Sequence, residues 1–304
     1  MVSYENRMYW YNTGIGIELQ EEYMREVNVS IIEEKVKEAC MNIAVEYSPE
    51  ILRALQRGAA EETTDKARAA LNMLLENARI AREERIAICQ DTGMNIVWIT
   101  AGQDVHFTGG SLREAVTRGL EAGFREGYLR ASVVDDPLFD RKNTGTNTPA
   151  VIYCDIVPGE DVVVEIMAKG FGSENKSQTK MLAPAEGREG IKKFVLETIR
   201  EAGPNACPPM IVGVGIGGSF DYSTYLAKRA LLRPINESNP NERYKQLEDE
   251  LTEAANELNI GPMGLHGKTT ALKVMVEYYP THIASLPCAV NICCHASRHA
   301  KVVI

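Results

Sequence analysis

Three of the seven cysteines lie in sequence contexts whose neighbours could take part in chemistry. Cys89 opens the run Cys89-Gln90-Asp91-Thr92-Gly93, which places a thiol, an amide, a carboxylate and a hydroxyl side by side. Cys207 precedes two prolines that restrict its backbone, and Cys294 opens Cys294-His295-Ala296. Thiolates from three loops can hold a metal cluster that leaves one iron without a protein ligand, and an open iron suits Lewis-acid chemistry. On spacing alone, buried cysteines that only pack are the alternative.

The remaining cysteines and the composition narrow the function classes. An odd, scattered set of cysteines in a chain without a signal-peptide pattern argues against a disulfide framework, and the paired spacing of structural zinc sites is absent from the sequence. The net charge of −9 gives no basic footprint for nucleic acid, and no apolar stretch is long enough to span a bilayer. We therefore expect a cytoplasmic protein that binds neither nucleic acid nor membrane.

The elements that must position these residues follow from hydrophobic periodicity. Residues 1–27 lack periodicity and are predicted to be an N-terminal extension or arm. Residues 28–304 are predicted to form one domain, helical over residues 28–85 and α/β over residues 86–304. The expected fold class is α/β, with a helical lead-in followed by mixed β-sheets that helices flank.

Local signals place the first helices. Ser30 with Glu33 has the pattern of a capping box, and an apolar face follows it. A second helix is expected from Pro49 to a stop at Gly58, and a third is expected to begin after Thr64. The lead-in is thus predicted to contain three amphipathic helices.

Strand signals and glycine runs complete the outline. The apolar run at residues 86–88 predicts a strand that ends at Cys89, and residues 150–157 and 161–168 are predicted to pair as strands across a short turn. The run at residues 213–218 resembles a dinucleotide loop but lacks the following strand and acidic residue, so a turn that permits close packing is the better interpretation. The run at residues 264–269 has Pro262 where a phosphate loop needs glycine.

The chain resembles the class I fumarases and their relatives, the iron–sulfur hydro-lyases. The resemblance extends from about residue 30 to the C-terminus, and its motifs stand in the family's order. They are Cys89-Gln90-Asp91-Thr92-Gly93; Arg141-Lys142-Asn143-Thr144-Gly145 with Asn147-Thr148-Pro149; Gly172-Ser173-Glu174-Asn175-Lys176-Ser177; Asn205-Ala206-Cys207-Pro208-Pro209; Gly213–Gly218; Gly261-Pro262-Met263-Gly264; and Thr281-His282-Ile283-Ala284-Ser285-Leu286-Pro287 with Cys294-His295-Ala296.

The resemblance implies a cofactor and a set of site residues. It implies a 4Fe–4S cluster, with Cys294 favoured over its neighbour Cys293 by the Cys-His-Ala spacing. The implied cluster ligands are Cys89, Cys207 and Cys294. The implied substrate contacts are Gln90, Asp91, Arg130, Gly172 and His282. Within this set, Asp91 is expected to handle the hydroxyl proton, and His282 to bind or polarise a carboxylate. Lys268 and Arg298 rank below these as candidates for the anionic pocket.

The resemblance also implies a partner and a reaction. Single-chain members of the family continue for on the order of 150–200 further residues, about one domain. This chain stops at Ile304 and therefore looks like the α subunit of a hetero-oligomer whose β subunit completes the site. The implied activity is the reversible hydration of fumarate to (S)-malate, because the runs that begin at Gly172 and Thr281 are of the fumarase kind. The alternatives are the α subunit of L-tartrate dehydratase or of another hydroxy-dicarboxylate dehydratase, and a non-catalytic nucleotide- or zinc-binding interaction subunit.

Overall fold

The computed structural model describes residues 24–304. The predicted arm, residues 1–27, lies mostly outside this range. Its described end includes strand β1 (Arg25–Asn28), which pairs in parallel with strand β3 (Val105–Thr108). Within the described residues, no helix combines the length and the apolar character needed to cross a membrane.

Three helices form the lead-in, as predicted: α1 (Val29–Val45), α2 (Pro49–Glu61) and α3 (Asp65–Glu84). Two local predictions were wrong. Asn28 caps α1, since its side chain accepts a hydrogen bond from the Ser30 N–H at 3.0 Å. Gly58 lies inside α2 rather than at its end. A Cβ at this position would come within 3.1 Å of the Thr269 side chain. Close packing against that side chain explains this glycine.

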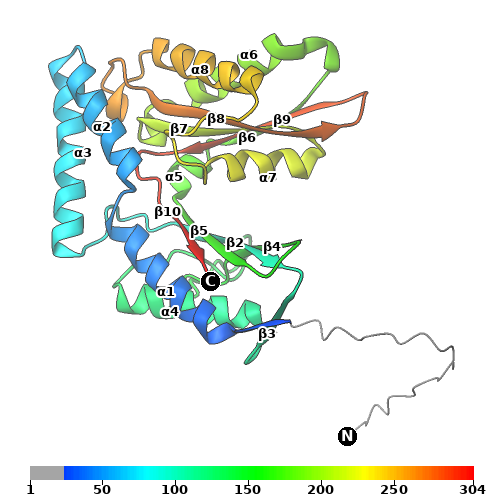
Figure 1. Cartoon of the computed structure of the whole chain (residues 1–304). Coiled ribbons are helices and arrows are strands. Elements are labelled where there is room, and N and C mark those ends of the chain that lie inside the picture. The colour runs from blue at the N-terminus through cyan, green and yellow to red at the C-terminus, as the bar shows by residue number, and fades with distance from the viewer. Residues whose placement is uncertain (1–23) are drawn as a thin grey trace, which may run out of the picture.

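The first large sheet has the strand order β10-β5-β2-β4, with β10 (His299–Val303), β5 (Val162–Lys169), β2 (Met94–Gly102) and β4 (Val151–Val157). Helices α1 and α4 (Leu112–Glu126) pack together, and their apolar side chains share a core with this sheet. Figure 1 shows both helices on the same face of the sheet.

The predicted pairing of residues 150–157 with residues 161–168 was wrong. Strand β2 lies between β4 and β5, parallel to the former and antiparallel to the latter. The connection crosses the end of β2, where the Gly102 N–H donates to the Asp161 carbonyl at 2.7 Å. A Cβ at Gly102 would lie 2.1 Å from the Gly159 carbonyl oxygen, so glycine is required for this crossing.

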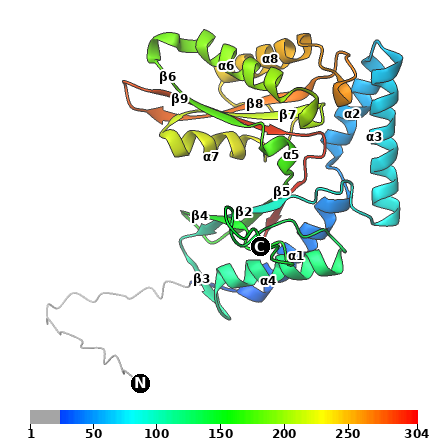
Figure 2. The same cartoon turned by 180° about the vertical axis from the view of Figure 1, so that it is seen from behind.

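The second large sheet has the order β6-β9-β7-β8, with β6 (Gln178–Leu182), β9 (Leu286–Cys293), β7 (Met210–Gly218) and β8 (Ala271–Thr281). Helix α7 (Phe220–Ala230) covers one face, and α6 (Gly187–Ala202) and α8 (Glu242–Glu257) cover the other (Figures 1 and 2). The short helix α5 (Phe171–Glu174) and the 3₁₀ turns η1 (Pro184–Glu186), η2 (Gly203–Ala206) and η3 (Pro262–Gly264) complete the elements.

A third apolar core joins the two sheets. It gathers side chains from α2, α3, β2 and β7, including Leu55, Leu71, Trp98 and Ile211. Figure 2 shows α2 and α3 standing beside both sheets. The expected fold class, α/β with a helical lead-in and mixed sheets, is therefore confirmed.

Both glycine-rich runs have structural explanations. A Cβ at Gly213 or Gly215 of β7 would lie 2.0 Å from a carbonyl oxygen of α7, so the glycines let this helix pack directly on the strand. In the other run, the Lys268 and Thr269 N–H groups donate to the Glu62 carboxylate at 3.0 and 2.6 Å. Those groups are therefore already paired within the chain.

Gly213→Ala should destabilise the fold strongly. The new methyl group would meet the Ala227 carbonyl oxygen on the helix backbone, so α7 must move away from β7. We expect the free energy of unfolding to fall by about 3 kcal/mol, as in an overpacked core. Urea denaturation would measure it, with Gly172→Ala as the control because a Cβ at Gly172 meets nothing within 4 Å. Equal losses in the two variants would contradict the packing explanation.

Candidate active site

The loop that presents Cys89 is held by helices. The predicted strand at residues 86–88 is absent: after α3 the chain turns at Arg85, which has φ 54°, and continues without a strand partner. The Ile88 N–H donates to the Ala44 carbonyl at 2.9 Å, and the Ile88 carbonyl accepts from Asn77 Nδ2 at 2.9 Å. Because α1 and α3 supply these partners, the loop is fixed without belonging to a sheet.

Cys207 and Cys294 belong to adjacent loops. Cys207 follows η2 with φ 51°, and its carbonyl accepts from the His295 N–H at 3.3 Å. Burial raises the pKa of the Cys207 thiol, and Cys89 and Asp91 raise it further. Asp91, in the Cys89 turn, accepts from the N–H of Phe171 at the start of α5, and α5 packs on η2. The structure therefore brings the loops of the three predicted cysteines near one another.

Exposure separates these three cysteines from the others. Cys89, Cys207 and Cys294 are half-buried, whereas the remaining four are either fully buried or exposed. Burial raises the pKa of Cys40 and of Cys288 to about 12, as expected for thiols in an apolar core. The buried ones are Cys40, Cys288 and Cys293, and the exposed one is Cys154.

The donor set fits a cluster better than a single ion. Among residues 24–304 no three His, Cys, Asp or Glu side chains are placed to hold one metal ion. A 4Fe–4S cluster spreads its thiolates over different irons, so its ligands need not converge on one point. Three half-buried thiols from three loops, without a fourth, agree with a cluster that keeps one iron free of protein ligands.

Asp91 joins the Cys89 loop to the first residue of α5. One carboxylate oxygen accepts from the Gly93 N–H at 3.0 Å, which is an Asx turn, and the other accepts from the Phe171 N–H at 2.8 Å. The carboxylate is thus oriented by two backbone donors beside Cys207. Gly172 lies one residue beyond Phe171, exposed, with open space where a side chain would be.

Arg130 and Gln90 flank the same turn. Thr92 Oγ1 donates to the Arg130 carbonyl at 2.6 Å, and Asn147 Nδ2 donates to the Gly93 carbonyl at 3.0 Å. These bonds tie the segment that follows α4 to the Cys89 turn. The Arg130 and Gln90 side chains are exposed, so both are free to meet a ligand.

His282 is not brought to the cysteines of its own chain. It lies in the turn between β8 and β9, where its Nδ1 accepts from the Ala284 N–H at 3.2 Å. Strand β9 leads from this turn to Cys293, a distance of about 23 Å at the usual rise per residue. The proposed substrate contact of His282 therefore stays a prediction that one chain alone does not satisfy.

A buried ion-pair network behind the site was missed at the level of sequence. Glu174 lies 3.3 Å from the Nζ of the buried Lys169, is hydrogen-bonded to Lys228 and accepts from Asn291 Nδ2 at 2.9 Å. Ser177 Oγ also accepts from Asn291, at 3.0 Å. Polar side chains of the run that begins at Gly172 thus form ion pairs and hydrogen bonds with other parts of the same chain. Its partners are far away in sequence, so no local signal could have identified them.

Glu174→Gln should destabilise the chain by about 3–5 kcal/mol near neutral pH, because Lys169 and Lys228 would lose their carboxylate in a buried place. Chemical denaturation would measure the loss. The matched control is Glu38→Gln, which breaks a half-exposed pair with Lys35 and should cost less than about 1 kcal/mol. A cost for Glu174→Gln no larger than that of the control would contradict a stabilising network.

The same network should make the chain sensitive to acid. Burial raises the pKa of Glu174, but Lys169 and Lys228 outweigh burial, and the pKa is lowered overall. The unfolded chain then binds more protons, so this stabilisation is complete above the ordinary glutamate pKa and is lost as pH falls through the lowered value. Burial also lowers the pKa of Lys228, against the attraction of Glu174, so we assign the acid effect to Glu174 alone. The Glu174→Gln variant should lose this part of the pH dependence.

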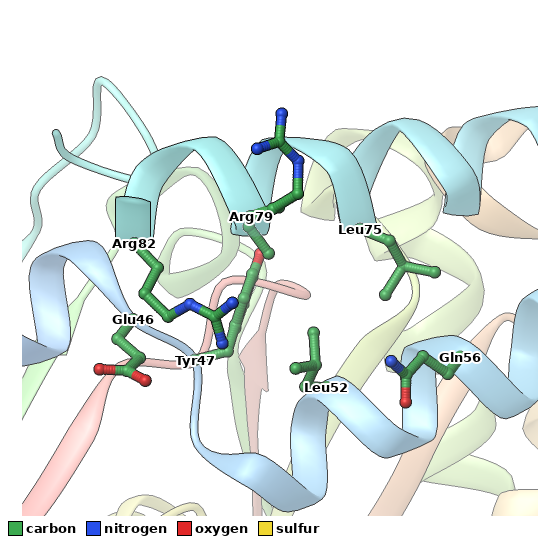
Figure 3. Close-up of a pocket in the computed structure, with 8 residues that line it drawn as sticks. Glu46, Tyr47, Leu52, Gln56, Leu75, Arg79 and Arg82 are labelled. Atoms are coloured by element: carbon green, nitrogen blue, oxygen red, sulfur yellow. The ribbon is translucent and has the colours of Figure 1, made fainter. Parts of the chain in front are cut away.

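A cavity of about 220 Å³ lies between α2 and α3, and Tyr47 forms part of its wall. Figure 3 shows Leu52 and Leu75 facing each other across it, with the Tyr47 ring in its wall. The Tyr47 hydroxyl is hydrogen-bonded to His295 Nδ1 at 2.8 Å. None of the predicted site residues lines this cavity, so we do not assign it to the substrate.

Comparisons with known proteins identify the family of the chain. The family model described as fumarate hydratase (Fumerase) matches residues 33–303. A protein of Methanocaldococcus jannaschii named putative L(+)-tartrate dehydratase subunit alpha is 39% identical over 274 residues, which cover 88% of this chain and 96% of that protein. The L(+)-tartrate dehydratase subunit alpha of Escherichia coli O157:H7 is 33% identical, over 86% of this chain and 87% of its own. The chain therefore belongs to the fumarate hydratase (Fumerase) family.

Proposed function

We propose that this chain is the cluster-binding α subunit of a hydro-lyase that adds water to, or removes it from, a small dicarboxylate. The observation that carries the proposal is the convergence of Cys89, Cys207 and Cys294, half-buried on three loops, beside the oriented carboxylate of Asp91. The similar proteins are named as alpha subunits, which supports a β subunit as the partner.

Each residue of the site has a role in this proposal. A 4Fe–4S cluster held by the three cysteines would supply a Lewis-acid iron for the substrate hydroxyl. Asp91 keeps unused lone pairs on both carboxylate oxygens and takes up or returns the hydroxyl proton there. The Arg130 guanidinium binds a substrate carboxylate through two parallel N–H groups, and Gln90 donates from its amide. At Gly172 the missing side chain lets a carboxylate approach the backbone.

Breaking a carbon–hydrogen bond needs a base besides these groups. When water leaves, the carbon–oxygen bond breaks, Asp91 returns a proton to the departing hydroxide, and a second proton leaves the neighbouring carbon. We assign the removal of that proton to a residue of the β subunit. The isolated α chain should then bind the cluster but turn over substrate poorly. A normal rate from the α chain alone would contradict this division.

We propose fumarate and (S)-malate as the first substrate pair. The description of the family model supports this choice, whereas the names of the similar proteins favour L-tartrate as the second candidate. Glu174 and Ser177, within the run taken from sequence as fumarase-like, bond inside the chain. That run is therefore a poor guide to the substrate.

The deciding experiment compares substrates on the anaerobically prepared complex of both subunits. Turnover of fumarate, mesaconate and L-tartrate would be measured together with iron and acid-labile sulfide. A brown protein whose fastest substrate is fumarate supports the proposal, and a dominant tartrate rate would replace the substrate but keep the hydro-lyase. A colourless, zinc-containing and inactive complex would favour the interaction subunit instead. Air exposure should inactivate the enzyme, because an iron without a protein ligand is open to oxidants.

A further inference from the structure

Arg298 stands apart from the other buried charges. Four charged side chains are buried in residues 24–304: Glu62, Lys169, Glu248 and Arg298. The two carboxylates accept backbone or arginine N–H groups, and the Lys169 Nζ lies 3.3 Å from a Glu174 oxygen. Arg298 is 2% exposed, and its Nε and Nη1 have no hydrogen-bond partner. Among the described residues it also forms no ion pair within 4.0 Å.

Such an arginine needs an anion. A guanidinium stays protonated at any pH at which proteins fold, so it cannot relieve burial by losing its charge. Burying an unpaired charge is strongly unfavourable, and buried arginines are normally paired with carboxylate or another acceptor. The backbone of Arg298 is satisfied in part, since its carbonyl accepts from the Ala168 N–H at 3.0 Å, but this bond leaves the side chain unpaired.

The position of Arg298 places it at the candidate site. It lies on the segment that links β9 of one sheet to β10 of the other, four residues after Cys294. Its Nη2 lies 3.5 Å from the point where a Cβ at Gly170 would be, and an Asp91 carboxylate oxygen lies 3.1 Å from that same point.

We propose that Arg298 is the counter-charge of the group that Cys89, Cys207 and Cys294 would hold, and that its unpartnered Nε–H and Nη1–H are left available for that group. The inference rests on the proposed function, because it takes the bound group to be an iron–sulfur cluster. Arg298 is a positioning residue. It does not touch substrate, and it balances the negative charge that three thiolates and their cluster bring into a buried place.

This role separates the metal-free state from the loaded state. Without the cluster, the unpaired guanidinium destabilises the chain, so Arg298→Met should leave the melting temperature of the metal-free protein unchanged or raise it. With the cluster, the guanidinium has its anion, so the same variant should gain less in melting temperature upon loading than the wild type gains. An arginine that only supports the fold would behave in the opposite way in the metal-free protein.

The experiment compares full-length wild type, Arg298→Met, Arg298→Lys and the control Arg229→Met. Arg229 is a partly buried arginine paired with Glu165 at 2.6 Å, away from the cysteines. Each protein is treated anaerobically with ferrous iron and sulfide, and iron content, melting temperature and the midpoint potential of the cluster are measured. In Arg298→Met we expect about 10-fold weaker retention of iron against a chelator and a more negative midpoint potential. Arg298→Lys should restore part of the iron retention and of the midpoint potential, and Arg229→Met should match the wild type in both of these.

Failure of the proposed function and failure of the role of Arg298 would give different results. If the wild type takes up no iron and sulfide, the proposed function itself fails, and this inference fails with it. If the wild type takes up the cluster and Arg298→Met retains it equally well at the same potential, only the role of Arg298 is overturned. A metal-free Arg298→Met that melts well below the wild type would also overturn it, because Arg298 would then be a structural residue.

Discussion

Serine at any one of Cys89, Cys207 and Cys294 should remove nearly all of the bound iron and all measurable hydration activity. A serine hydroxyl is a far weaker ligand than a thiolate at neutral pH, and two remaining thiolates do not hold a cluster that needs three. The loss should exceed the roughly 10–100-fold effects that follow from changing partners of metal ligands. Iron and sulfide content after anaerobic loading would measure it, before any rate is compared.

The neighbouring cysteines provide controls. Cys154→Ser changes an exposed thiol, and Cys293→Ala changes the buried neighbour of Cys294. Both variants should retain iron, although Cys293→Ala should cost some stability because it leaves a small cavity at the end of β9. If Cys293→Ala loses the cluster and Cys294→Ser keeps it, the third ligand has been assigned to the wrong cysteine.

Asp91→Asn should lower the turnover number by about 10²–10⁴ while the cluster stays bound, because an amide cannot take up the hydroxyl proton. The substitution also turns one of two oxygens that accept backbone N–H groups into a donor. Iron content and melting temperature therefore have to be measured beside the rate. The expected signature is a large fall in turnover with almost unchanged iron content.

Asp136→Asn is the matched control for this change. Its carboxylate also accepts two backbone N–H groups, from Leu138 and Phe139, but in an exposed turn outside the cysteine loops. Both bonds end on Oδ1, which an amide keeps as an acceptor, so this variant tests the same change of charge in a backbone-bonded turn and should not lose activity. A fall in rate as large in Asp136→Asn as in Asp91→Asn would show that the effect comes from disturbed backbone rather than from proton transfer.

Local signals predicted much of the fold. Periodicity placed α1, α2 and α3 and the strands β4 and β5, because an apolar face at helical or alternating spacing is a property of the segment itself. Pairing was harder to predict. The order β5-β2-β4 depends on Gly102 meeting Gly159, two residues that only the folded chain brings together. Strand β10 was missed, because its five residues alternate weakly and pair with β5 from a distant part of the chain.

The candidate site, like the fold, was predictable only in part. The contexts of Cys89, Cys207 and Cys294 pointed to one place, and the structure brings their loops together. The lack of a hydrogen-bond partner for the buried Arg298 side chain was not predictable, because it depends on which groups the fold places around it. The separation of His282 from Cys294 follows from the length and direction of β9, which motif order does not encode.

The hydrogen bond from the His295 N–H to the Cys207 carbonyl has a consequence for how metal enters. It holds two ligand loops together through backbone alone, and helices α1 and α3 hold the third through Ile88. In the proposed site the ligand loops would thus be in place before any metal arrives, unlike those of small zinc domains, which fold only as they bind. Most of the conformational entropy that is lost in arranging the ligand loops is therefore lost when the chain folds. Loss of metal in air should then leave an intact receptor that can be refilled repeatedly.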